Sequence, residues 1–125
     1  MSPRILVVED TEDNRQIVRD LLGAVGIDMV EAHDGLSGVE IALRERPDLI
    51  LMDIDLPGID GYEATRRIRA QSPDHKVPII AVTSFALSGD DAKARAAGCT
   101  DYVAKPYSPR ALLSKIREHL GERIA

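Results

Sequence analysis

Residues Leu49 to Gly61, LILMDIDLPGIDG, decide how this chain can fold. The segment opens with four apolar residues, and the acid Asp53 follows them directly. An uninterrupted apolar run of this length is typical of a strand that is buried on both faces of a parallel sheet. Pro57 and Gly58, which come next, are typical turn residues. The segment therefore predicts a buried strand that ends on a carboxylate.

Similar short apolar runs recur along the chain, and segments with helical spacing separate them. The other runs are Ile5 to Val8, Met29 to Val30, Pro78 to Val82 and Tyr102 to Ala104. This alternation predicts a parallel sheet with helices on both faces, because parallel strands need crossover connections. Five strands in 125 residues favour a three-layer, flavodoxin-like (βα)5 α/β fold with strand order 2-1-3-4-5. Asp28 and Glu31 place the second strand at an edge of this sheet.

Composition limits the classes of function. The 125 residues fit a single domain, residues 1–125, without room for a second folded domain. A net charge of -5 argues against a direct nucleic-acid partner. Neither a signal peptide nor a membrane span is recognisable, so we expect a cytoplasmic protein without membrane insertion. The single cysteine, Cys99, is interpreted as a small apolar core residue.

Polar residues follow four of the five predicted strands. They are Glu9 and Asp10, Asp53, Thr83 and Ser84, and Lys105. Each has an ordinary explanation: Asp10 as a helix cap, Asp53 as a turn residue, Thr83 as a strand end and Lys105 as a solvated lysine. Because the carboxyl ends of parallel strands meet at one edge of the sheet, we expect these side chains to converge there. The ordinary explanations do not account for that convergence.

Three gathered acids need more positive charge than one lysine provides. Two carboxylates about 4 Å apart repel each other by roughly 4 kcal/mol at an effective dielectric constant of about 20. Mg²⁺ fits such a site, since it prefers carboxylate, phosphate and water oxygens. The sequence has no His or Cys constellation for zinc, and we expect His33, His75 and His119 to be separate surface residues.

The motifs VVED (7–10), LILMDIDLPGIDG (49–61), VTS (82–84) and KP (105–106) together resemble the response regulator receiver family of two-component signalling, in particular its DivK-type single-domain members. The resemblance covers essentially the whole chain. It implies that Asp53 accepts a phosphoryl group from a histidine kinase or a histidine phosphotransferase. It also implies that Glu9, Asp10, Asp53 and the backbone carbonyl of Asp55 hold Mg²⁺.

The same resemblance assigns Lys105 and Thr83 to the phosphoryl oxygens, and Thr83 and Tyr102 to a conformational switch. We expect Leu87 to Ala97 to be a moving element, because this segment has few large apolar residues. A downstream protein target is expected on the face of the fourth helix, fifth strand and fifth helix, with Arg110, Lys115 and Arg117, and a homodimer is possible.

Two alternatives stay open at this stage. Asp53-Ile54-Asp55 after an apolar strand also resembles the nucleophile and acid of haloacid-dehalogenase-type phosphatases. There, however, the motif normally ends the first strand, whereas here two strand-helix units precede it. The other alternative is an adaptor that keeps the receiver fold but works without phosphate. On the main interpretation the protein is a signalling phosphoacceptor, not an enzyme with an external substrate.

Overall fold

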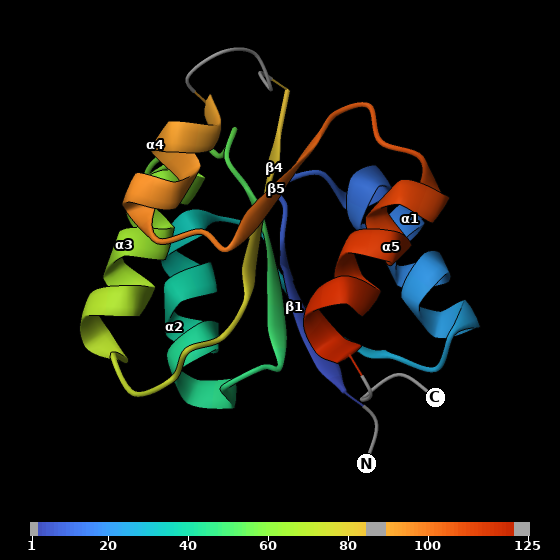
Figure 1. The fold of residues 1–125 in the computed structure, drawn as a ribbon, viewed down its shortest axis with the longest axis horizontal. Coiled ribbons are helices and arrows are strands. Elements are labelled where there is room, and N and C mark those ends of the chain that lie inside the picture. Colours follow the sequence, from blue (N-terminus) through green and yellow to red (C-terminus); the bar gives the residue numbers. More distant parts are fainter. Residues whose placement is uncertain (1–2, 85–89, 122–125) are drawn as a thin grey trace.

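The apolar runs of the sequence form five parallel strands in one sheet (Figure 1). In the computed structural model, which describes residues 3–84 and 90–121, the sheet order is β2-β1-β3-β4-β5. The strands are β1 (Arg4–Val8), β2 (Asp28–Ala32), β3 (Leu49–Asp53), β4 (Ile79–Thr83) and β5 (Asp101–Ala104). The predicted flavodoxin-like order is confirmed, and β2 with its charged residues lies at an edge.

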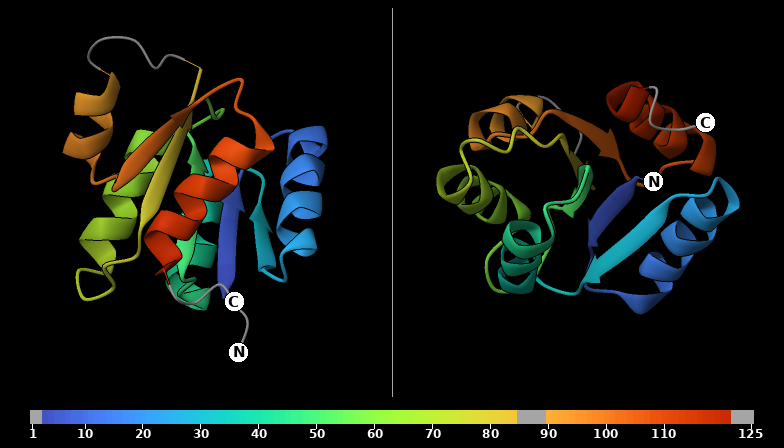
Figure 2. Two further views of the ribbon diagram at one scale, coloured as in Figure 1. Left: turned by 45° about the vertical axis from the view of Figure 1, so that its right-hand side comes forward. Right: turned by 90° about the horizontal axis from the view of Figure 1, so that it is seen from below.

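Five helices cover the two faces of the sheet. They are α1 (Glu12–Ala24), α2 (Gly35–Glu45), α3 (Gly61–Gln71), α4 (Asp90–Ala97) and α5 (Pro109–Leu120). Helices α1 and α5 lie on one face, and α2, α3 and α4 lie on the other (Figure 2). Polar side chains cap three of these helices, because Asp34, Asp60 and Ser108 each accept a hydrogen bond from a backbone N–H of the first turn.

Alternating residues of the central strands supply the two halves of the core. In β1, Leu6 and Val8 pack with α2 and α3, while Ile5 and Val7 pack with α1 and α5. All five residues of β3 are buried, including Asp53 at its end. A strand that is fixed on both faces is a rigid support for its last side chain.

Several smaller expectations from the sequence can be compared with the structure. Cys99 is buried and belongs to the core on the α2–α3 face, as expected. Of the segment expected to move, Leu87 to Ala97, residues 87–89 lie outside the described part of the chain. Within residues 3–84 and 90–121, no helix combines the length and apolar character that crossing a membrane requires.

Candidate functional site

Three acids converge at the carboxyl ends of β1 and β3. A carboxylate oxygen from each of Glu9, Asp10 and Asp53 lies within 4.8 Å of the others. Glu9 and Asp53 are buried, whereas Asp10 is exposed. The helix cap proposed for Asp10 is not formed, because the N-cap of α1 is Thr11, whose backbone N–H donates to Glu9 Oε2. Asp10 is therefore available to a cation that approaches from solvent.

Lys105, which follows β5, supplies positive charge from the neighbouring side. Its Nζ donates to Asp53 Oδ1 at 3.0 Å and lies 3.8 Å from Glu9 Oε1. Burial acts to lower the pKa of Lys105, but the hydrogen bond to Asp53 and the surrounding acids outweigh burial and hold that pKa above its usual value. Lys105 is thus a permanent cation at this site.

The pKa of Glu9 is raised mainly by burial of its side chain. Burial raises the pKa of the Glu9 carboxyl to about 7, with smaller raising contributions from Asp10 and Asp53. A hydrogen bond from the Thr11 N–H and the charge of Lys105 oppose this rise without cancelling it. Lys105 therefore does not offset the combined effect of burial and the neighbouring acids on Glu9.

The two oxygens of Asp53 have different surroundings. Oδ1 accepts hydrogen bonds from the backbone N–H of Asp55 at 3.0 Å and from Lys105 Nζ. The Asp55 bond is the turn role that was considered for Asp53, so the turn and the site coexist. None of the described residues donates a hydrogen bond to Oδ2. Every fully buried side-chain oxygen of the described residues has a hydrogen-bond partner, so Oδ2, which has none, is not fully buried. Oδ2 consequently keeps contact with solvent and is the oxygen available for reaction.

Thr83 and Tyr102 lie on the strands beyond Asp53. Thr83 is the buried last residue of β4, and its carbonyl accepts from the Lys105 N–H at 2.7 Å. Tyr102 lies opposite Ala81 of β4 and packs, half-buried, against the core of the α2–α3 face. The predicted switch residues are therefore linked through adjacent β4 and β5, at different levels of the sheet.

A cavity of about 480 Å³ opens beside Glu9 and Lys105. It is lined by Glu9, Asn14, Ile17, Ser84, Lys105, Pro106, Tyr107 and Pro109. Tyr107, which the sequence analysis did not single out, also packs against the core of the α1–α5 face, and burial raises the pKa of its phenol. Its spacing of two residues after Lys105 is the sequence signal that could have indicated it.

The family model of the response regulator receiver domain matches residues 5–117 of this sequence. The chain belongs to the response regulator receiver family. The polar-differentiation response regulator DivK of Brucella anthropi is 38% identical over 122 residues, which cover 98% of this chain and 99% of that protein.

Solved receiver structures agree with this assignment. The receiver domain of sensor histidine kinase PA1611 from Pseudomonas aeruginosa, which has a magnesium ion coordinated in its active site cleft, is 41% identical. That comparison covers 98% of this chain and all of that domain, with a TM-score of 0.88. Chemotaxis protein CheY4 of Vibrio cholerae is 28% identical over 96% of this chain and all of CheY4, with a TM-score of 0.90.

As a receiver domain, the chain is a phosphoacceptor response regulator of two-component signalling. Receiver domains interact with histidine kinases and with downstream targets. Neither the family match nor these relatives support the haloacid-dehalogenase-type alternative or the phosphate-independent adaptor.

Two expectations about surface residues need correction. Arg110 and Arg117 line a cavity with Leu21 of α1, so they face the α1–α5 groove instead of the surface shared with β5. His33 is exposed as expected, but His75 is half-buried, and the His119 side chain is only 18% exposed and bonded to Asp101. Arg110, Leu113 and Arg117 repeat at helical spacing next to the buried stripe of α5, a signal that could have placed the arginines.

Proposed function

We propose that Asp53 receives the phosphoryl group from a histidine kinase or a histidine phosphotransferase. The observation that carries this proposal is the asymmetry of its carboxylate. Asp55 and Lys105 donate to Oδ1, while Oδ2 keeps contact with solvent beside two further acids. The hydrogen bonds at Oδ1 orient the side chain, and buried β3 fixes its backbone.

The transfer is covalent catalysis by a carboxylate. Oδ2 of Asp53 attacks the phosphorus of a phosphohistidine, a phosphorus–oxygen bond forms, and the bond from phosphorus to the imidazole nitrogen breaks. The electron pair of that bond returns to the imidazole of the donor. The product on the receiver is an aspartyl phosphate, and the chain performs only this transfer to itself and the later hydrolysis.

The donor atoms at the site fit Mg²⁺. Glu9, Asp10 and Asp53 offer carboxylate oxygens only, which suits a hard cation. The backbone carbonyl of Asp55 is proposed as a further ligand. When bound, Mg²⁺ neutralises charge on the transferring phosphoryl group. Glu9 and Asp10 hold the ion, while Asp53 serves as both ligand and nucleophile.

Lys105 and Thr83 are proposed to bind oxygens of the phosphoryl group, and Thr83 with Tyr102 to transmit the change. A charge-assisted hydrogen bond contributes about 1.5–3 kcal/mol. Moving a two-state equilibrium from 1:99 to 99:1 requires about 5.5 kcal/mol. The threonine contact alone is therefore insufficient, so Lys105, the ion and the bound partner must contribute to switching.

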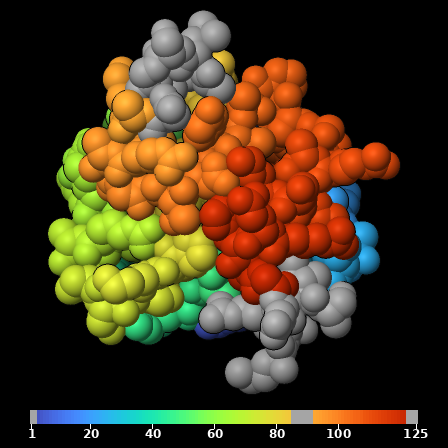
Figure 3. Space-filling view, in the orientation of Figure 1, coloured from blue at the N-terminus to red at the C-terminus, as the bar shows by residue number. Residues whose placement is uncertain are grey.

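Output is proposed to pass through the face that α4, β5 and α5 share (Figure 3). Tyr102 on β5 lies at this face and packs against the core, so a change in its position would reach both the surface and the interior. The same face could serve a downstream protein or a second copy of the chain. We propose that residues 1–125 form one receiver unit, since the family match spans 5–117.

Stoichiometric labelling tests this function. With Mg²⁺ present, acetyl phosphate is expected to add one phosphoryl group per chain, as counted by intact-mass spectrometry, and chelation of Mg²⁺ is expected to prevent it. An aryl phosphate supplied in excess is expected to give no continuing release of phenol. Multiple turnovers of the aryl phosphate, or labelling that is independent of Mg²⁺, would contradict the proposal.

Asp55 is expected to tune the lifetime of the aspartyl phosphate. Its carboxylate is exposed, and its Oδ2 lies 3.4 Å from the backbone nitrogen of Ser84, the residue after Thr83. A carboxylate there can accept a proton from the attacking water, so Asp55→Asn should slow dephosphorylation by about 100-fold, the lower end of general-base effects. The measurement is the decay of labelled protein in Mg²⁺. Faster decay would show that repulsion of water dominates, and an unchanged rate would remove the role.

A further inference from the structure

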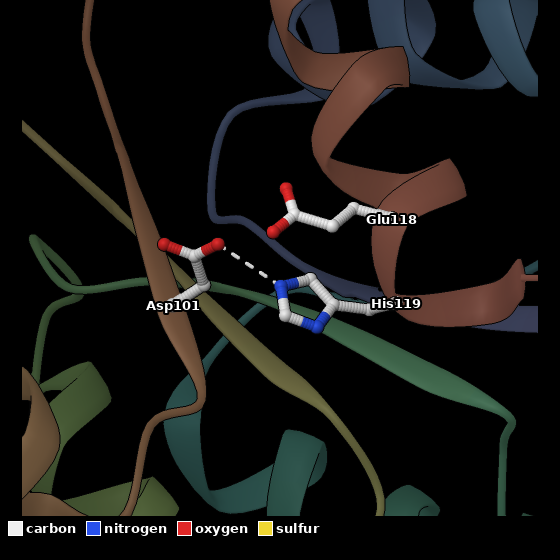
Figure 4. A group of neighbouring side chains, drawn as sticks. All are labelled: Asp101, Glu118 and His119. Atoms are coloured by element: carbon white, nitrogen blue, oxygen red, sulfur yellow. Dashed lines mark hydrogen bonds and ion pairs between the residues drawn. The ribbon is translucent and has the colours of Figure 1, made fainter.

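The amino end of β5 and the last turn of α5 form a second cluster of metal-ligating side chains. One ligand atom from each of Asp101, Glu118 and His119 lies within 4.8 Å of the others. Figure 4 shows Asp101 reaching out from β5, while Glu118 and His119 extend toward it from α5. This cluster lies at the opposite end of β5 from Lys105, so it is separate from the phosphoacceptor site.

The geometry points to a site for a late first-row divalent cation of the Zn²⁺ class at Asp101, Glu118 and His119. The donor set distinguishes it from the phosphoacceptor site, because an imidazole nitrogen joins two carboxylates. Imidazole suits Zn²⁺ and its neighbours, whereas oxygen-only sets suit Mg²⁺. No sequence motif indicates this site, since His119 stands alone among the histidines and Asp101 is 18 positions away.

The three side chains are close to the separations that a metal requires. His119 Nε2 lies 2.9 Å from Asp101 Oδ2. Ligand atoms about 2.1 Å from a tetrahedral Zn²⁺ lie roughly 3.4 Å from one another. On binding Zn²⁺, those two atoms would therefore move apart by about half an ångström, and the Glu118 carboxylate would move toward the ion. Three protein ligands leave a coordination position for water, as in an exchangeable site.

Glu118 is exposed, and among the described residues it makes no hydrogen bond or ion pair, although Asp101 and His119 are nearby. It also lies in the last turn of α5, where the helix dipole disfavours an acid and favours a cation.

Lys115 is the competitor for this site. Its Nζ donates to both carboxylate oxygens of Asp101, at 3.0 and 3.1 Å. A metal must therefore displace Lys115 from at least one oxygen of Asp101.

Calorimetric titration of the full chain with Zn²⁺, in excess Mg²⁺, tests the inference. We expect one Zn²⁺ per chain, and a weakening of more than about tenfold in His119→Gln, because even the loss of an outer-shell partner has that effect. Glu118→Gln should also weaken binding, and it cannot disrupt the fold through a lost contact. Lys115→Gln should strengthen binding, which a purely structural ion-pair cluster would not predict. The matched control is His33→Gln, which removes an exposed histidine beside Asp34.

The outcomes separate this inference from the proposed function. No stoichiometric Zn²⁺ binding by the wild type, or binding that His119→Gln leaves unchanged, would overturn the site. Replacement of Zn²⁺ by Co²⁺ gives a second readout, since visible absorption that disappears in His119→Gln reports nitrogen coordination directly. Neither measurement requires phosphorylation, so failure here would leave the role of Asp53 untouched.

Discussion

Asp53→Asn is expected to abolish labelling of the protein by acetyl phosphate. The substitution keeps the shape of the side chain but replaces the nucleophilic carboxylate by an amide, which cannot form the aspartyl phosphate. It also removes one of the three acids that are proposed to hold Mg²⁺. Intact-mass spectrometry after incubation with acetyl phosphate and Mg²⁺ is the measurement, and we expect no detectable phosphorylated species.

Asp60→Asn is the matched control for this loss. Asp60 lies seven positions further along the same connection, is exposed, and caps α3 by accepting from the Glu63 N–H. Asparagine is an equally good cap, so the control changes one acid to its amide without altering the site. Asp60→Asn should be labelled like the wild type. Substantial labelling of Asp53→Asn, with a circular dichroism spectrum like that of the wild type, would place the phosphoacceptor elsewhere.

The sequence was sufficient to predict the sheet because its strands are almost uninterrupted apolar runs. A buried parallel strand must be apolar on both faces, so β1, β3 and β4 had few alternative interpretations. Once these strands were parallel, their carboxyl ends had to lie at one edge, which brought Glu9, Asp53 and Lys105 together. Only the boundaries differ slightly: Asp53 and Thr83 are the last residues of their strands, not the residues after them.

Details that depend on side-chain reach could not be predicted in this way. The sequence does not tell which oxygen of Asp53 binds Lys105, because that depends on the course of the segment after β5. The contact between Asp101 and His119 depends on how α5 lies across the sheet, so His119 was wrongly expected to be a surface residue. Periodicity identifies the buried stripe of α5, but it does not identify the partner of a polar residue at the margin of that stripe.

Gly61 is a residue of the site region that the sequence analysis overlooked, and Gly61→Ala is expected to be strongly destabilising. A Cβ at this position would overlap the carbonyl oxygen of Asp53 and lie 2.8 Å from the Cα of Ile54. Both are backbone atoms, so neither can rotate away. Overpacking of this kind costs about 1–3 kcal/mol of unfolding free energy, measurable by urea denaturation.

Gly23→Ala is the same chemical change, but we expect it to have the opposite effect on stability. Gly23 lies inside α1, and a Cβ there would meet nothing within 4 Å. Replacing a helical glycine by alanine should therefore stabilise the protein by about 0.5–1 kcal/mol. Gly61→Ala should also lower the rate of labelling by acetyl phosphate, since the clash displaces the backbone that carries Asp53, whereas Gly23→Ala should not. If the two variants were equally stable and equally labelled, the close approach of α3 to the end of β3 would have no part in holding the phosphoacceptor in place.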